Sequence, residues 1–186
     1  STLTYLPTAG EEIARADAVL ISGDITNFGG YPDAEDVLSA LVRLNPRILA
    51  VPGNCDLPAV NRCLVDRGMN LHCNTMELDG VAFLGICGWL AGPEDGPQSQ
   101  AGLRRPMYDA LERLSAALPD AALKVLVTHQ PPADTAIDAF GDGGHGGSPE
   151  IRGWIERHRP VLAVAGHAHE AAGVDRIGST VVVNPG

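Results

Sequence analysis

Two histidines that are separated by one residue directly follow an apolar run near the end of the chain. In VLAVAGHAHEAAG (Val161–Gly173), five apolar residues lead through Gly166 into His167 and His169. A continuous apolar run predicts a strand that is covered on both faces. Imidazole is the commonest metal ligand among side chains, so the pair could bind a metal ion. Two histidines on an exposed turn explain this stretch equally well when it is taken alone.

Polar side chains that can bind metals also follow three other apolar runs. AVLIS leads into Asp24, RILAV leads into a turn that contains Asn54, and KVLVT leads into His129. In open α/β sheets, ligands collect in the crevice beyond the carboxyl ends of the strands. We therefore expect these three side chains to lie at one edge of the fold, together with His167 and His169.

The chemistry of this set favours a divalent cation. A carboxylate, an amide oxygen and several imidazoles suit a metal of intermediate hardness, such as Mn²⁺, Fe²⁺ or Zn²⁺. Each residue alone also has an ordinary explanation, because Gly-Asp and Pro-Gly-Asn are common turns. Independent turns need not all carry metal-binding side chains, so the combination favours a metal site.

Length, composition and charge set the broad class of the protein. A chain of 186 residues with 45% hydrophobic content is typical of one folded domain with a sizeable core. The net charge of −10 argues against a nonspecific nucleic-acid surface, although a bound cation would still permit phosphate substrates. No apolar run approaches the roughly 18 residues of a membrane span. The four cysteines form no CxxC pair, which predicts reduced thiols in a cytoplasmic protein.

Strand and helix patterns alternate along the chain, which predicts an α/β domain with much of its sheet parallel. Six apolar runs predict strands over residues 18–22, 47–51, 81–87, 124–128, 161–165 and 180–184. The pair Asp79-Gly80 predicts a hairpin turn before the third of these strands.

Three helices are predicted between the strands. Asp33 is the expected N-cap of a helix over residues 34–44. Apolar residues from Met107 to Leu118 have helical spacing, and Ser148 is the expected cap of a helix over residues 149–158. Two loops rich in glycine and proline, over residues 88–102 and 131–148, have a length typical of functional or disordered segments.

With these motifs, the chain resembles the calcineurin-like metallophosphoesterases. That family carries, in order, Asp-x-His, Gly-Asp, Gly-Asn-His-Asp/Glu, His and Gly-His-x-His. The chain has SGDIT, PGNCD, THQPP and AGHAH in the same order, and GGHGGSPEIRGWIERHRP and GSTVVVNPG resemble small bacterial and archaeal phosphodiesterases. The resemblance implies one domain over residues 1–186 that folds as a four-layer αββα sandwich with mixed sheets.

The resemblance also implies a site with two divalent metal ions. Asp24 would bridge both ions. Asn54, His129 and His167 would complete the shell of one ion, and His169 would bind the other. Manganese is the expected metal, with iron, zinc, cobalt and nickel as alternatives. The implied reaction is hydrolysis of a small phosphodiester by a metal-bridging hydroxide that attacks phosphorus in line. The acidic charge and the lack of a long apolar run predict that the protein forms no stable nucleic-acid complex and does not act at a membrane.

Two departures from the family pattern concern the ends of the chain and position 55. No Asp-x-His precedes Asp24, so we expect that the N-terminal strand that carries it is missing from the sequence, and that the end at NPG is also trimmed. Cys55 stands where many members have a histidine that assists the leaving group, and a structural role for this thiol is favoured. Without a histidine at position 55, protonation of the leaving group would be weaker, so we expect a preference for diesters with good leaving groups.

His145, in the glycine-rich loop, is the candidate for a catalytic side chain that replaces the missing histidine and faces the substrate. The sequence is equally consistent with a flexible, solvated His145 that has no catalytic role. Asp56 is expected to orient the site rather than to bind metal.

Two other functions remain open. The chain could be an inactive family member that serves as a protein-binding scaffold, which the missing Asp-x-His motivates. A nucleotide-binding domain that uses GDGGHGGS as a phosphate loop is a weaker alternative, because the loop lacks the GxGxxG spacing between a strand and a helix.

Overall fold

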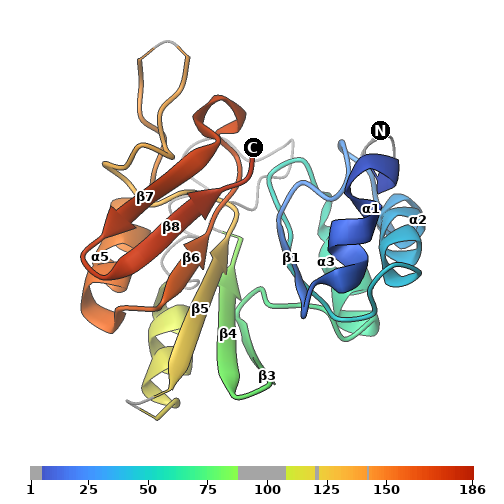
Figure 1. Cartoon of the computed structure of the whole chain (residues 1–186), viewed down its shortest axis with the longest axis horizontal. Coiled ribbons are helices and arrows are strands. Elements are labelled where there is room, and N and C mark those ends of the chain that lie inside the picture. Colours follow the sequence, from blue (N-terminus) through green and yellow to red (C-terminus); the bar gives the residue numbers. More distant parts are fainter. Residues whose placement is uncertain (1–5, 88–107, 120–121, 142) are drawn as a thin grey trace.

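The computed structural model describes residues 6–87, 108–119, 122–141 and 143–186, and its strands form two sheets (Figure 1). The smaller sheet is a parallel pair of β1 (Val19–Ser22) and β2 (Ile48–Val51). The larger sheet has the strand order β3-β4-β5-β6-β8-β7. Its strands are β3 (Asn74–Leu78), β4 (Val81–Ile86), β5 (Leu123–Thr128), β6 (Leu162–Val164), β7 (Gly173–Ile177) and β8 (Thr180–Asn184). The β3–β4 and β7–β8 pairs are antiparallel and the other pairs are parallel, so the sheet is mixed.

Helices cover the outer face of each sheet (Figure 1). The smaller sheet is covered by α1 (Leu6–Arg15), α2 (Tyr31–Val42) and α3 (Pro58–Asp66). The larger sheet is covered by a helix over residues 108–116 and by α5 (Pro149–His158). A short 3-10 helix, η2 (His169–Ala171), follows β6. None of the helices in the described part of the chain is long and apolar enough to cross a membrane.

The alternation of side chains along β2 shows that this strand lies between two layers. Ile48 and Ala50 belong to a buried cluster with side chains of α2 and α3. Leu49 and Val51 belong to a different cluster, which includes Phe83 of the larger sheet. Successive side chains of a strand point to opposite faces. The smaller sheet is therefore covered by helices on one face and by the larger sheet on the other.

The same alternation along β5 completes the layering. Val125 and Val127 pack in the cluster between the two sheets. Leu126 packs on the opposite face, in a third cluster with Leu111 and Trp154 from the outer helices. Three buried clusters thus separate four layers, which confirms the expected αββα sandwich.

The strand predictions are confirmed, and the helix predictions are confirmed in part. All six predicted strands are present, and Asp79 (φ 51°) and Gly80 (φ 79°) form the predicted turn with the left-handed backbone that such hairpins require. The third predicted helix is present with Ser148 as its cap, because the Ser148 hydroxyl accepts a hydrogen bond from the Ile151 amide. The sequence patterns did not predict α1, α3 and β7.

The predicted start of α2 is wrong by three residues. The helix begins at Tyr31 with Gly30 as its N-cap, and Pro32 lies in its first turn. Asp33 is the third residue of the helix, and its carboxylate accepts a hydrogen bond of 2.8 Å from the Gly30 amide. An acidic side chain at the third position of a helix can cap the backbone of the residue before the first turn. The sequence pattern therefore identified the capping residue but not its position in the helix.

The second predicted helix is described over residues 108–116, with Leu111 fully buried. Its predicted first residue, Met107, and the predicted loop over residues 88–102 lie outside the described residues.

His72 links the segment before β3 to the end of β4. Its Nδ1 accepts a hydrogen bond of 3.1 Å from the Cys87 amide, which requires a neutral ring. Burial lowers the pKa of His72 from 6.5 to about 4. The folded state therefore binds this proton less readily than the unfolded state.

We expect this linkage to make the protein less stable in weak acid. Because the folded pKa of His72 lies below its unfolded value, stability falls as the pH drops from about 6.5 toward 4. Between pH 7.5 and 4.5, we expect the protonation of His72 to lower the free energy of unfolding by about 2–3 kcal/mol. Urea unfolding of the parent and of His72→Asn, which keeps a hydrogen-bond acceptor for the Cys87 amide, measures it. The same pH dependence in both proteins would contradict this assignment.

Candidate functional site

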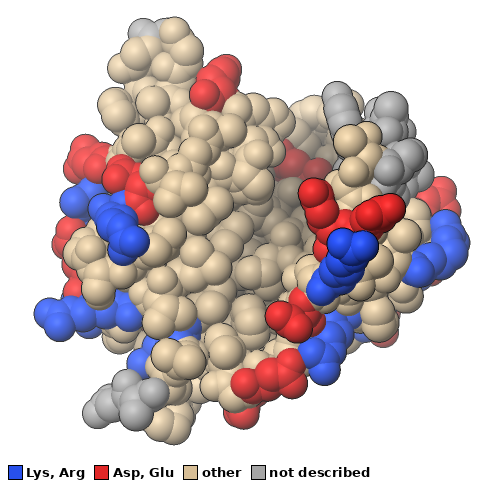
Figure 2. Space-filling model, viewed as in Figure 1, with Lys and Arg blue, Asp and Glu red and all other residues tan. Residues whose placement is uncertain are grey.

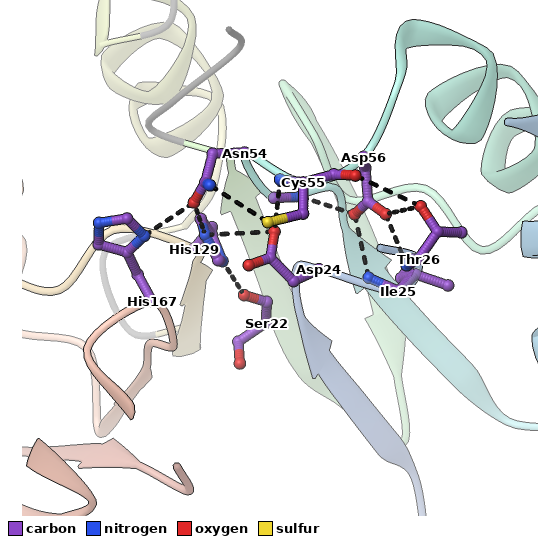
Figure 3. Close-up of polar contacts among 10 residues, drawn as sticks. Ser22, Asp24, Ile25, Thr26, Asn54, Cys55, Asp56, His129 and His167 are labelled. Carbon is purple, nitrogen blue, oxygen red and sulfur yellow. Dashed lines mark hydrogen bonds and ion pairs between the residues drawn. The ribbon is translucent and has the colours of Figure 1, made fainter. Parts of the chain in front are cut away.

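The amide side chain of Asn54 connects the two sheets at the carboxyl ends of their strands (Figure 3). Asn54 follows β2 of the smaller sheet, and its Oδ1 lies 2.7 Å from His129 Nε2 and 2.8 Å from His167 Nδ1. His129 follows β5, and His167 follows β6 of the larger sheet. Three of the side chains that the sequence placed at one edge are therefore in direct contact.

The hydrogen bonding of His129 shows that acceptor atoms face one another in this group. Its Nδ1 lies 2.8 Å from the carbonyl oxygen of Ser22, so Nδ1 carries the proton that this acceptor needs. In the neutral ring, Nε2 then carries a lone pair directed at the Asn54 oxygen. Two lone pairs at 2.7 Å repel each other, and a cation bound by both atoms would relieve the repulsion.

Asp24 adds a carboxylate to the same group. Its Oδ1 lies 3.6 Å from His129 Nε2 and accepts a hydrogen bond of 2.8 Å from the Cys55 amide. A carboxylate, an amide oxygen and two imidazoles form a donor set that fits a divalent cation of intermediate hardness. Counting only His, Cys, Asp and Glu side chains, no group of three within the described ranges is arranged to hold a metal ion. The fit to a metal therefore depends on Asn54.

His169 lies in the same cleft as these residues but is not part of the cluster around Asn54. It is an exposed residue at the start of η2, and it lines a cleft of about 680 Å³ together with Asp24, His129 and His167. Figure 2 shows a hollow between the two halves of the molecule, with mostly uncharged walls and acidic side chains at its upper end. His169 is thus near the other expected ligands without belonging to the cluster around Asn54.

The turn that carries His167 and His169 is fixed by a buried asparagine. Asn184, at the end of β8, donates hydrogen bonds to the carbonyl oxygens of Ala168 (2.6 Å) and Ala171 (3.3 Å).

Burial lowers the pKa of His167 below its usual value, and the neighbouring His129 adds to this effect. A neutral imidazole is the form that binds metal ions.

The backbone at this site adopts unusual conformations. Asp24 (φ 51°) and His167 (φ 69°) are both left-handed, which is uncommon for residues other than glycine. A Cβ on Gly23 would overlap the ring of His129, and a Cβ on Gly53 would overlap the carboxylate of Asp24. The glycines therefore allow side chains from both sheets to approach the backbone closely.

Asp56 ties the loop after β1 to the loop after β2 (Figure 3). Its buried carboxylate accepts hydrogen bonds from the amides of Ile25 (3.1 Å), Thr26 (2.8 Å) and Gly53 (2.8 Å), and from the Thr26 hydroxyl (2.8 Å). These loops carry Asp24 and Asn54. Asp56 therefore holds together the loops that carry two expected ligands, which is the position expected of a residue that orients the site.

Cys55 has the environment of a structural thiol. Burial is the largest cause that raises its pKa to about 11, and the nearby carboxylates of Asp24 and Asp56 add to the effect. Its Sγ accepts a hydrogen bond of 3.4 Å from the amide nitrogen of Asn54. A thiol that keeps its proton so strongly is a poor acid–base catalyst near neutral pH.

His145 is not part of the cluster around Asn54. It lies in a hairpin of the glycine-rich loop, where its Nδ1 is 2.8 Å from the carboxylate of Asp138. The sequence patterns singled out neither Asp138 nor Phe140, whose ring contacts the ring of His167 in an edge-on arrangement. Only the folded hairpin brings these residues together, so spacing along the chain contains no signal for them.

Comparisons with known proteins identify the family of this chain. A family model of the calcineurin-like phosphoesterases matches residues 2–171. The chain belongs to this family. Its members generally use divalent metal ions, and membership supports the hydrolysis of phosphate esters.

Among curated relatives, the uncharacterized protein MJ1162 of Methanocaldococcus jannaschii is 32% identical over 97% of this chain and 82% of its own length. A probable cyclic nucleotide phosphodiesterase of Synechococcus is 29% identical over 83% of this chain, which spans 58% of that protein.

Two solved structures share the fold. TT1561 of Thermus thermophilus superposes with a TM-score of 0.66 at 21% identity, over 99% of this chain and 80% of its own. The phosphopantetheinyl hydrolase of Mycobacterium tuberculosis superposes with a TM-score of 0.65 at 16% identity, over 89% of this chain and 77% of its own.

We predict that Asp56→Ala destabilises the protein by about 2–4 kcal/mol, because the donors of four buried hydrogen bonds lose their acceptor. Urea unfolding measures the change. Asp36→Ala, on the exposed face of α2, is the matched control and should change stability by less than about 0.5 kcal/mol. Equal unfolding midpoints for the two variants would refute the bridging role of Asp56.

We also predict that Gly53→Ala disrupts the site. The added methyl group overlaps the Asp24 carboxylate, which we expect to lower stability by about 1–3 kcal/mol and to weaken Mn²⁺ binding measured by calorimetry. Gly10→Ala in α1 is the control, because its nearest neighbour would be a Leu44 methyl group at 4.0 Å. That change should leave metal binding intact and stabilise the helix by up to about 1 kcal/mol. Normal metal binding by Gly53→Ala would contradict the close approach.

Proposed function

We propose that this protein is a metal-dependent phosphodiesterase that hydrolyses a small phosphodiester with the help of two divalent ions, most simply manganese. The observation that carries the proposal is the position of the Asn54 oxygen between two imidazole nitrogens, at 2.7 and 2.8 Å, with the Asp24 carboxylate beside them. Bound divalent ions would supply the Lewis acidity that polarises the phosphoryl group and activates the attacking water.

Each side chain of the cluster has a proposed role. Asn54, His129 and His167 would hold one ion, His169 would hold a second ion, and Asp24 would be a ligand of both. Ser22 holds His129 in the tautomer whose Nε2 faces the cluster, and Asp56 holds the two loops at the correct separation.

The substrate is proposed to be a small diester rather than a nucleic-acid chain or a lipid surface. A net charge of −10 disfavours long polyanions, whereas a compact phosphate group can approach a bound cation in the cleft. The name of the Synechococcus relative makes cyclic nucleotides the first substrates to test. The cysteine pattern is consistent with a reducing compartment, and we propose the cytoplasm.

The deciding experiment measures metal content and hydrolysis of bis-p-nitrophenyl phosphate with added Mn²⁺. We expect turnover by the parent chain. In Asp24→Asn the rate of hydrolysis should fall roughly 100-fold or more and metal binding should weaken, because loss of a direct ligand should cost at least as much as loss of a residue that orients one. Asp36→Asn, an exposed change of the same type, should match the parent.

The opposite outcome favours the scaffold alternative. A folded parent chain that binds no metal and hydrolyses neither this ester nor cyclic nucleotides would refute the proposal. Turnover that is equal in the parent and in Asp24→Asn would place the activity elsewhere.

A further inference from the structure

The glycine-rich loop folds into a hairpin that is attached to the site. Ala139 and His145 form an antiparallel bridge, and the hairpin rises as an orange loop above the ends of the strands in Figure 1. Gln130, the neighbour of His129, donates a hydrogen bond of 2.9 Å to the carbonyl oxygen of Gly146. On the other side of the hairpin, the ring of Phe140 contacts the ring of His167 with centroids 5.9 Å apart. The hairpin therefore has a defined position beside two expected metal ligands.

A buried carboxylate holds this hairpin and orients His145. Asp138 has no exposed surface. Its Oδ1 accepts hydrogen bonds from the Thr135 amide (3.1 Å) and from His145 Nδ1 (2.8 Å). Its Oδ2 accepts from the amides of Asp134 (3.2 Å) and Gly147 (3.3 Å). A carboxylate that is fixed by three backbone amides cannot turn, so it fixes the direction of the imidazole that it binds.

The other nitrogen of His145 is available to a ligand. Since Nδ1 donates its proton to Asp138, Nε2 is the atom that can exchange a proton with a bound molecule. The side chain of His145 is 57% exposed, and its Nε2 makes no hydrogen bond to any residue within the described ranges. A buried acid thus holds an exposed imidazole on a hairpin that contacts His167 through Phe140.

We propose that His145 donates a proton to the leaving group during phosphodiester hydrolysis, and that Asp138 is its positioning residue. This inference rests on the proposed function. In the step, the attacking water forms the new P–O bond and releases a proton to solvent. The P–O bond to the leaving group breaks, the leaving oxygen takes the proton from His145 Nε2, and the imidazole then regains a proton from solvent.

The electrostatics of His145 agree with this geometry. The hydrogen bond to Asp138 is the largest cause that raises the pKa of His145, followed by the charges of Asp138 and, more weakly, Asp134. A raised pKa keeps more of the imidazole in the protonated form that can donate to a leaving group.

The leaving-group dependence of His145→Gln tests the donor role. We expect this variant to lose less than about 3-fold in kcat/KM with a p-nitrophenyl diester, because that leaving group needs little protonation, and roughly 100-fold or more with an alkyl diester. His158→Gln is the matched control, since His158 also pairs with a carboxylate, that of Glu112, but on the outer helices. It should match the parent with both esters.

The pH dependence of kcat/KM distinguishes a positioning role of Asp138 from a purely structural role in folding. With the alkyl diester, kcat/KM of the parent should fall as the pH rises through the raised pKa of His145, because the proton is then lost. This limb should move to lower pH in Asp138→Asn and disappear in His145→Gln. NMR titration of His145 in the metal-free protein should show the same drop in pKa in Asp138→Asn, independently of activity.

Two outcomes would overturn the inference, and they are distinguishable. An active parent with the same leaving-group dependence as His145→Gln would refute the donor role alone and leave the proposed function intact. A parent that is inactive with every ester would refute the proposed function and the donor role with it.

Discussion

The site depends on one contact across the two sheets, that of Asn54 with His129 and His167. The small sheet supplies the amide and the large sheet supplies the imidazoles, so the layers must keep their separation and register at the strand ends. The buried cluster that includes Leu49, Val51 and Phe83 sets this separation, because close-packed interiors resist small displacements. Apolar packing between the sheets therefore determines a polar geometry at their edge.

Strained backbone at the site is offset by buried hydrogen bonds nearby. The left-handed conformations of Asp24 and His167 cost of order 1–3 kcal/mol each. Asp56 fixes the loop that follows Asp24, and Asn184 fixes the turn that follows His167. Each buried hydrogen bond contributes about 1 kcal/mol, and more when one partner is charged. The residues that support the site thus stabilise a conformation that the chain would otherwise avoid.

The sequence predicted the features that follow from local rules. Apolar runs locate the strands, and parallel strands bring their carboxyl ends to one edge, so these rules alone were enough to place Asp24, Asn54 and His129 together. They could not predict how α2 begins, because Asp33 can cap a helix from before its first turn or from within it. Nor could they identify Asp138, whose partners meet only when the hairpin closes.

The two kinds of site residue differ in what holds them. Asn54, His129 and His167 follow the ends of strands, where the packing of the sheets restricts their movement. His145 stands on a hairpin outside the sheets, and a single buried carboxylate fixes the direction of its ring. Since the hairpin also touches His167 through Phe140, its position is coupled to the ligand cluster. The proposed proton donor is therefore positioned by one loop, whereas the packing of the two sheets positions the cluster around Asn54.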